Sequence, residues 1–387
     1  MYNRHLFTDS SAHLDTNKRK TKESAKDIYQ IMHKNKIVAS ISTTGKAFVY
    51  LEQYMPYDLY FEEDDDIDTR VNNLNVFYHW CASRVLSLDR KYAKVILNSI
   101  GMPQAITDKD RAKISLSYHC VSLTDVFWVR NDKDKILFEQ INIYNNPLNE
   151  ALVDLTLKGH QMSVTNKELQ ELAPDLSTKG CFSKAWIRKN GSFVLLKDGG
   201  TDVVKREILA SRICQCFDFK QVRYSEYFYD GEPVTQSEIV TSIDYSIVSK
   251  AAFDIYAVNH DLDTIEICKE IDPETFYGMN ILDYLIGNTD RHEENWGFLV
   301  ENKNNHYISL YPLMDFNQCF LSYDTLDGAG CLTLRPLLVS QREAAIEAVK
   351  QIGLRQICEI EPEWFDEMIK EAEMFQKRLN ELKKYEK

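Results

Sequence analysis

Residues 287–297, GNTDRHEENWG, and residues 310–320, LYPLMDFNQCF, are the two stretches that decide how this chain is interpreted. The first is polar, although the apolar segment ILDYLI runs directly into it. The second places one acid, Asp315, inside an apolar run. Burying a carboxylate costs on the order of several kcal/mol unless it is paired or bound to a cation. The two stretches therefore indicate either a connecting loop followed by an exposed acid, or a site for a metal ion and phosphate.

Asp290 and Asn295 lie five residues apart, which is the spacing of the acid and the amide in a protein-kinase catalytic loop. In such a loop the acid accepts the proton of the attacking hydroxyl, and the amide holds a metal ion. The alternative is a polar loop in which Asp and Asn only form turns. We favour the functional interpretation because the loop lies between a buried-looking helix and a predicted hairpin. Asp315 follows that hairpin, in the position of a second metal ligand.

Two neighbours of Asp290 have more than one interpretation. His292 has the residue type of a general base, but a structural role is favoured, in which it hydrogen-bonds Asp315 or the backbone to hold the loop. For Arg291, a phosphate contact, a loop contact and simple exposure all stay open.

Lys197 ends the apolar strand FVLLK, and Glu207 lies in the amphipathic helix that follows. In a kinase, a strand-borne Lys binds the ATP phosphates and pairs with a Glu of the next helix. Taken alone, the two residues would be interpreted as a surface Lys and a surface Glu. Their order relative to Asp290, Asn295 and Asp315 is what favours a kinase site.

The pattern of predicted elements divides the chain into four parts. Residues 1–26 are polar and mixed in charge, which predicts a poorly ordered leader. Residues 27–165 are predicted to form an N-terminal accessory region or N-lobe subdomain, residues 166–242 a β-rich kinase N-lobe with a nucleotide loop, and residues 243–387 a helical catalytic C-lobe. The sequence thus predicts an α+β, bilobal, protein-kinase-like fold.

Within the accessory region, the pattern predicts a hairpin over residues 36–54 and one helix over residues 71–99. The acidic run FEEDDDID between them is interpreted as a solvated loop rather than a cation site, because no Gly-spaced Ca²⁺ loop surrounds it. The next lobe is predicted as two hairpins with one helix between them. After residue 243 the chain is predicted to turn helical, with a helix ending at Gly287, a hairpin, and two C-terminal helices.

The composition excludes several classes of protein. The chain has 387 residues, of which 44% are hydrophobic, so it can bury a sizeable core. Its net charge of −13 argues against a general nucleic-acid-binding surface. No run approaches the ~18–20 apolar residues of a membrane span, and no secretory signal is visible at the N-terminus. The nine cysteines show no zinc-ligand spacing and are interpreted as reduced thiols of a cytoplasmic protein.

Together these motifs resemble those of the HipA-like Ser/Thr protein kinases of bacteria, over roughly residues 75–350. DYLIGNTDRHEENWGFL and LYPLMDFNQCF are similar to the catalytic and metal-binding segments of that family. STKGCFSKAWIRKNGSFVLLKDGG resembles its Ser-x-x-Gly-x-x-x-Lys loop with the strand lysine. VSLTDVFWVR is similar to the segment that precedes the kinase core in Gram-positive members.

The resemblance implies a bilobal kinase that uses ATP with Mg²⁺ to phosphorylate a protein Ser or Thr. It implies Asp290 as the catalytic acid/base, Asn295 and Asp315 as Mg²⁺ ligands, and Lys197, paired with Glu207, as the lysine that binds ATP phosphates.

The loop before the first strand of the β-rich lobe has its own counterparts in the family. Ser177 falls on the family's autophosphorylated serine, and Gly180 and Lys184 fall on the loop glycine and lysine. In the family, phosphorylation ejects this loop and switches the kinase off. Asn317 departs from the pattern because the family usually has Gly two residues after the metal-binding Asp. Since Asn tolerates positive φ, the turn is expected to survive.

Partners are implied by the resemblance alone. Many members are toxins that pair with a small DNA-binding antitoxin and phosphorylate a translation component. We expect a protein substrate, and neither direct nucleic-acid binding nor membrane association. Two other functions stay open: a lipid kinase similar to phosphoinositide kinases, which use a similar Asp-Arg-His-x-x-Asn loop, and a nucleotide-binding pseudokinase regulator.

Overall fold

The computed structural model describes residues 27–102, 107–145, 153–160, 171, 173–321 and 323–386. The predicted leader, residues 1–26, and the predicted boundary at 165/166 lie outside these residues. None of the helices described is both long enough and apolar enough to cross a lipid bilayer.

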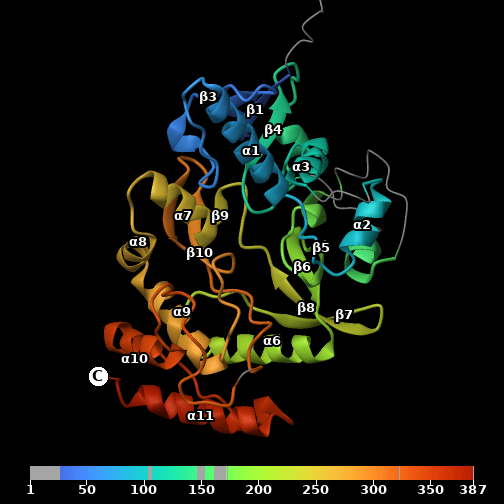
Figure 1. Ribbon diagram of the computed structural model, residues 1–387. Helices are drawn as coiled ribbons and strands as arrows, with labels where there is room; N and C mark the ends of the chain where they lie inside the picture. The colour runs from blue at the N-terminus through green and yellow to red at the C-terminus, as the bar shows by residue number, and fades with distance from the viewer. Residues whose placement is uncertain are drawn as a thin grey trace, which may run out of the picture.

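An antiparallel four-stranded sheet with helices packed beside it forms the first part of the molecule (Figure 1). The strand order is β3-β2-β1-β4, and the predicted hairpin over residues 36–54 is confirmed by the pairing of β2 with β3. Apolar side chains of the sheet and of α1 and α3 share one core. The elements are β1 (Ile28–His33), β2 (Lys36–Ser42), β3 (Ala47–Val49), η1 (Glu52–Tyr54), α1 (Ile67–Ser83), α2 (Ala93–Ser99), α3 (Asp108–Ser117), β4 (Phe127–Asn131) and α4 (Phe138–Ile141).

The single helix predicted over residues 71–99 is wrong, because the chain forms two helices, α1 and α2. The chain leaves α1 at Arg84. The buried guanidinium of Arg84 donates two hydrogen bonds to Asp125, of 2.7 and 2.9 Å. Tyr92 then takes a φ of 68° immediately before α2. The apolar spacing continues across residues 84–92, so periodicity does not detect the break.

The β-rich lobe has the predicted order of hairpin, helix and hairpin. Its sheet has the order β5-β6-β8-β7, and α6 contacts β8. In the β5–β6 pairing, Lys184 is the partner of Lys197, which places both lysines at neighbouring positions in the sheet. The elements are the one-turn π-helix η3 (Asp154–Lys158), β5 (Ser183–Lys189), β6 (Ser192–Asp198), α6 (Thr201–Cys214), β7 (Ser225–Tyr229) and β8 (Glu232–Glu238).

The helical lobe begins with a strand, which corrects the prediction that the chain turns helical after residue 243. Residues of β9 pair with β10, about fifty residues later in the chain, in a sheet of order β11-β10-β9. A pairing partner so distant leaves no local signal. The predicted hairpin is confirmed as β10–β11. The elements are β9 (Tyr245–Ser249), α7 (Lys250–Asn259), α8 (Thr264–Ile271), α9 (Pro273–Ile286), β10 (Gly297–Glu301) and β11 (His306–Leu310).

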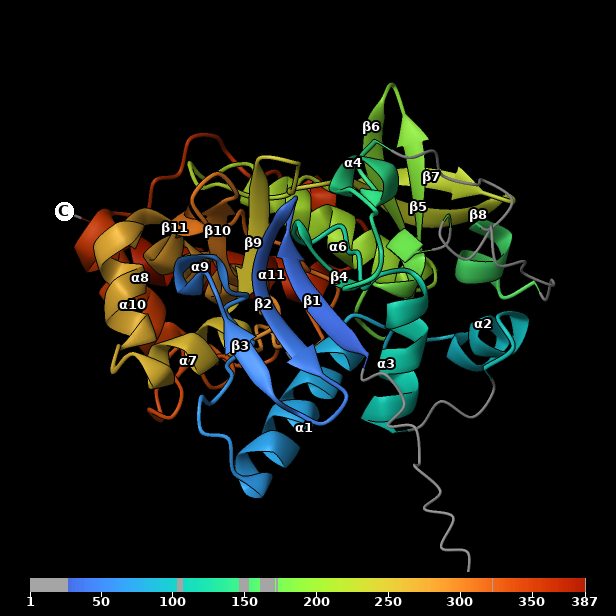
Figure 2. The same ribbon diagram turned by 90° about the horizontal axis from the view of Figure 1, so that it is seen from above.

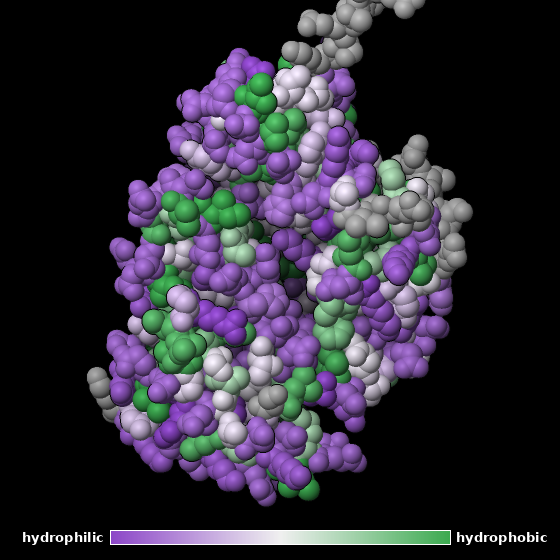
Figure 3. Space-filling view, in the orientation of Figure 1, coloured by the Kyte–Doolittle hydropathy of each residue, from purple (hydrophilic) through white to green (hydrophobic). Residues whose placement is uncertain are grey.

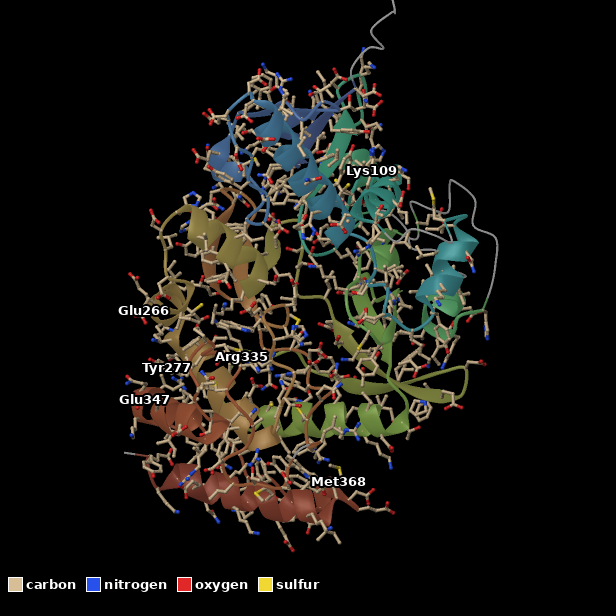
Figure 4. The ribbon with its side chains drawn as sticks, viewed as in Figure 1. Lys109, Glu266, Tyr277, Arg335, Glu347 and Met368 are labelled. Carbon is tan, nitrogen blue, oxygen red and sulfur yellow. A yellow bond between two sulfur atoms is a disulfide. The ribbon has the colours of Figure 1, made fainter. Side chains whose placement is uncertain are left out.

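Two helices close the chain, as predicted: α10 (Gln341–Ile352) and α11 (Ile369–Lys383), with the short η4 (Pro362–Phe365) between them. α10 packs closely on α9, and the largest core cluster joins α6 to the helices of this lobe. Figure 2 shows the first sheet lying across the junction of the two lobes. In Figure 4, Lys109 of α3 lies at the opposite end of the molecule from Met368, which precedes α11. The α+β, bilobal fold class is as predicted.

The cysteines depart from the expectation at one pair. Cys216, after α6, and Cys358, after α10, form a disulfide, whereas the remaining seven are free thiols as expected. The two partners are 142 residues apart in the sequence, so their spacing gave no reason to pair them.

Candidate active site

The catalytic loop predicted from the sequence begins where α9 ends. Gly287 ends that helix with a φ of 60°, and a Cβ at this position would lie 2.4 Å from the ring of Tyr323, so both the backbone and the space require Gly. The loop runs from there to β10, on the face where Figure 3 shows a hollow between the two lobes.

Arg291 holds this loop from inside. Its side chain is buried and makes a bidentate ion pair with Asp283 of α9, at 2.9 and 3.0 Å. It also donates to the carbonyls of Asn295 (2.9 Å) and Met314 (2.7 Å). Among the three alternatives for Arg291, the structure therefore shows the loop contact. Because Met314 directly precedes Asp315, one guanidinium fixes both predicted catalytic segments.

Asp290 and Asn295 face each other across the loop. The side-chain amide of Asn295 donates to the carbonyl of Asp290 (2.8 Å), which leaves its own side-chain oxygen available to a ligand. The Asp290 carboxylate is half-buried, and its burial followed by the charge of Asp315 raises its pKa above the ordinary value. The carboxylates of Asp290 and Asp315 are thus close enough to interact electrostatically, as two groups around one metal-phosphate centre would be.

Lys197, Glu207 and Asp315 form an ion-paired triad, in which Asp315 keeps 21% of its side chain exposed. Lys197 is 5% exposed and Glu207 is fully buried, which excludes the interpretation as surface residues. The Lys197 ammonium contacts Glu207 and lies 3.0 Å from Asp315 Oδ1. The Thr235 hydroxyl donates to the other Glu207 oxygen (2.9 Å). Burial alone would raise the pKa of Asp315, but Lys197 and Lys184 lower it to about 2.

The segment at Asp315 has an unusual backbone. Asp315 has a φ of 62°, a left-handed conformation that is rare for a non-Gly residue and that concentrates at functional sites. Its N–H donates to the Tyr224 hydroxyl (3.0 Å). Positive φ was expected at Asn317, but the left-handed residue is Asp315 itself. Asn317 donates its amide to Asp315 Oδ1 (2.5 Å), and its buried side-chain oxygen has no partner among the described residues.

The loop predicted to bind nucleotide lies against β5. Ser177 is buried and its hydroxyl donates to the carbonyl of Pro174 (3.2 Å). Gly180 has a φ of 102°, and a Cβ there would come within 2.4 Å of the Lys184 ammonium. That ammonium donates to the carbonyl of Lys179 (2.8 Å). Burial, together with the nearby charge of Lys197, lowers the pKa of Lys184 to about 8.

Two side chains that sequence reasoning missed, those of Arg90 and Lys179, fix this loop in place. Arg90, from the break between α1 and α2, donates to the carbonyls of Asp175 (2.9 Å), Thr178 (3.4 Å) and Lys184. Lys179 makes an ion pair of 3.1 Å with Glu294 of the catalytic loop. The loop is therefore joined to the accessory region on one side and to the helical lobe on the other. No local motif marks Arg90, because its partners are backbone carbonyls about ninety residues away.

His292 is exposed and lies at the edge of the site. Its Nδ1 accepts a hydrogen bond of 3.2 Å from the backbone N–H of Glu294, and its Nε2 is 3.9 Å from Asp290 Oδ1. Of the two predicted structural contacts, the structure shows the one to the backbone.

A metal ion would have few protein ligands here. Within the described ranges, no group of three or more His, Cys, Asp and Glu side chains is placed to hold one. Asp315, with the unpartnered oxygen of Asn317 and the side-chain oxygen of Asn295, offers the hard oxygen donors that suit Mg²⁺. Such a set fits an ion that takes its remaining ligands from substrate phosphates and water.

Comparisons with known proteins found structural likeness among solved structures. No protein-family model matches the chain, and no curated protein matches it. Among solved structures, the crystal structure of a Helicobacter pylori proinflammatory kinase, CtkA, matches with 16% sequence identity and a TM-score of 0.38. The match covers 52% of this chain and 90% of that chain. A likeness of this degree carries no weight for chemistry, which rests on the geometry above.

Proposed function

We propose that this chain is an ATP-dependent protein serine/threonine kinase of the HipA-like type. The observation that carries the proposal is the ion-paired triad of Lys197, Glu207 and Asp315, which joins a strand, a helix and a loop of two lobes. Charged Lys197 and Glu207 side chains held out of water cost free energy unless they serve a charged ligand or a mutual pairing. A lysine held by a helix Glu and an acid is the arrangement that binds phosphates in kinases.

Each side chain of the site has a role in this reaction. Lys197 and Lys184 bind phosphate oxygens, and Asp315, Asn295 and Asn317 provide oxygen donors for Mg²⁺. Bound Mg²⁺ would neutralise charge on the β- and γ-phosphates. Asp290 orients the attacking hydroxyl and accepts its proton, and its raised pKa brings it closer to the pH at which a base works best.

Transfer of label from γ-labelled ATP with Mg²⁺ tests the proposal. Label on protein, located by mass spectrometry on Ser177 or on an added protein, supports it. Label on lipid alone favours the lipid kinase, and tight ATP binding without transfer favours the pseudokinase. Phosphate found elsewhere on the chain but never on Ser177 would remove the autophosphorylation part. The antitoxin partner and the translation-component substrate remain proposals that rest on the sequence resemblance, and the cytoplasmic location remains a proposal that rests on the cysteine pattern.

Lys184 gives the site a predicted pH dependence. Because the pKa of Lys184 is about 8, its ammonium is charged at pH 7 and neutral at pH 9. Bound phosphate raises that pKa further, so ATP affinity falls as pH rises above 8, at most tenfold per pH unit. We expect roughly a tenfold weaker Kd at pH 9 than at pH 7 by titration calorimetry. Lys184→Arg keeps its charge throughout, so an equal decline in this variant would contradict the role.

Asn317 is expected to support the metal site. Asn317→Ala removes a hydrogen bond to a charged acceptor, which is worth about 1.5–3 kcal/mol, and an oxygen donor beside Asp315. Mg²⁺-dependent ATP affinity is expected to fall about tenfold, whereas affinity for ATP in the presence of EDTA changes little. Equal losses with and without Mg²⁺ would show that Asn317 only shapes the pocket.

A further inference from the structure

A groove lies on the molecule away from the proposed active site. It has a volume of about 560 Å³, within the range of ligand sites. One wall is the segment from the end of β3 through η1 to the start of the acidic run, and the other is the end of α7 with the turn of the β10–β11 hairpin. That turn is at the opposite end of β10 from the catalytic loop, on the order of 13 Å away along the strand.

The two walls are joined by specific hydrogen bonds. The hydroxyl of Tyr57 donates to the carbonyl of Asn305 (2.9 Å), and that of Tyr54 donates to the carbonyl of Lys303 (3.0 Å). In return, the Asn305 side chain donates to the carbonyls of Gln53 (3.3 Å) and Met55 (2.9 Å). The groove is therefore preformed, and a ligand need not bear the cost of assembling it.

Aromatic rings line much of the groove. Tyr57 stacks on Phe253 and contacts Tyr256 and Tyr307 edge-on, and Tyr256 stacks on His260 with ring centroids 4.0 Å apart. Of the other lining tyrosines, Tyr50 and Tyr60 are 57% and 49% exposed, so their rings are accessible to a ligand.

The carboxylates of the groove are the charged side chains of its described lining. Glu52 and Glu63 line it, and the described lining includes no Lys or Arg. Asp64 follows Glu63 in the acidic run, where the neighbouring Asp65 is already paired with Lys46 and Arg70. Within the described part of the chain, Glu52, Glu63 and Asp64 have neither a hydrogen bond nor an ion pair through their carboxylates. The acidic run thus leaves unpaired charge at the rim of an aromatic groove.

We propose that this groove binds a positively charged, extended segment of a partner protein. Carboxylates attract its Lys or Arg side chains, and the tyrosine faces hold them by cation–π contact. The same wall already contains one such contact, because the Lys36 ammonium lies 3.5 Å from the centroid of the Tyr54 ring. An extended segment fits because β3 and β11, which flank the groove, are edge strands of their sheets.

Peptide binding measured without nucleotide tests the proposal independently of kinase activity. The probes are fluorescein-labelled octapeptides that alternate Leu with Arg, Gln or Glu, and the readout is fluorescence anisotropy with the full chain at low salt. We expect the Arg peptide to bind at least tenfold more tightly than the Gln peptide, and the Glu peptide to bind least. Added NaCl is expected to weaken the binding.

Two variants of equal charge locate the site. Glu52→Gln with Glu63→Gln is expected to weaken binding of the Arg peptide about fivefold, since each exposed pair is worth about 0.2–1 kcal/mol. Glu226→Gln with Glu232→Gln, on the exposed β7–β8 hairpin, changes the net charge equally and is expected to leave it unchanged. Tyr60→Ser should weaken it about threefold through the lost ring. Thermal melts confirm that each variant is folded.

Three binding results would overturn the proposal. They are failure of the Arg peptide to bind, equal binding of the Arg and Gln peptides, and equal losses in the two charge-matched variants. The last result would mean general attraction to a chain of net charge −13. A photoreactive Arg peptide that labels only residues outside 49–63, 256–260 and 304–307 would also overturn it.

Discussion

Asp290→Ala is expected to lower the rate of phosphoryl transfer by ~10²–10³-fold or more, while ATP binding changes little. Asp290 has no role in holding nucleotide in the proposed mechanism. Its carboxylate is half-buried, near the charge of Asp315, and its proposed role is to accept the proton of the attacking hydroxyl. Interactions of this kind stabilise the transition state. The substitution is therefore expected to lower kcat and to leave the affinity for ATP nearly unchanged. Single-turnover transfer from labelled ATP and calorimetric titration of ATP measure the two effects separately.

Asp315→Ala serves as the comparison, because it removes a different part of the same site. We expect it to abolish transfer and also to weaken Mg²⁺-dependent ATP binding, since Asp315 contacts Lys197 and is proposed to bind the metal. His292→Ala controls for disturbance of the loop. Its ring is exposed and 3.9 Å from Asp290, so the rate should stay within about tenfold of the wild type. Near-normal transfer by Asp290→Ala, or a loss in His292→Ala as large as that in Asp290→Ala, would contradict the assignment.

Secondary-structure elements and contacts could be predicted where residues close together in the sequence determine them. The two hairpins around α6 follow from Asn-Gly and Asp-Gly turns between β-rich runs, and the end of α9 follows from Gly287. Lys197 and Glu207 are only ten residues apart on adjacent elements, so their pairing could be expected from element order. The broken helix over residues 71–99 was missed because a long-range pair, Arg84 with Asp125, sets the break.

The parts of the site that the sequence did not reveal depend on distant partners. The contact of Lys197 with Asp315 spans 118 residues, and no spacing rule predicts it. Arg90 donates to backbone carbonyls, which every residue provides, so its partners leave no signature in the sequence. The positive φ falls on Asp315, whereas the pattern pointed to Asn317. Backbone strain of this kind is imposed by the surrounding structure rather than by the residue type.

Arg291→Leu is expected to destabilise the fold by about 3–5 kcal/mol, the cost of breaking a buried ion pair by removing one partner. The Arg291 side chain is 2% exposed and that of Asp283 is 7% exposed, so the remaining carboxylate would stay out of water with one hydrogen bond, from Asn288. Urea unfolding monitored by tryptophan fluorescence measures the change.

The control for Arg291→Leu is Arg355→Leu, which breaks ion pairs with the exposed acids Asp218 and Glu274 and should cost no more than about 1 kcal/mol.

A double variant, Asp283→Leu with Arg291→Leu, removes both charges and is expected to be more stable than Arg291→Leu alone. If Arg291→Leu is as mild as Arg355→Leu, the guanidinium does not hold the loop. If the double variant is stable but transfers no phosphate, the pair orders the loop for catalysis beyond keeping it folded. Arg291 joins the segments that carry Asp290 and Asp315 through the carbonyls of Asn295 and Met314.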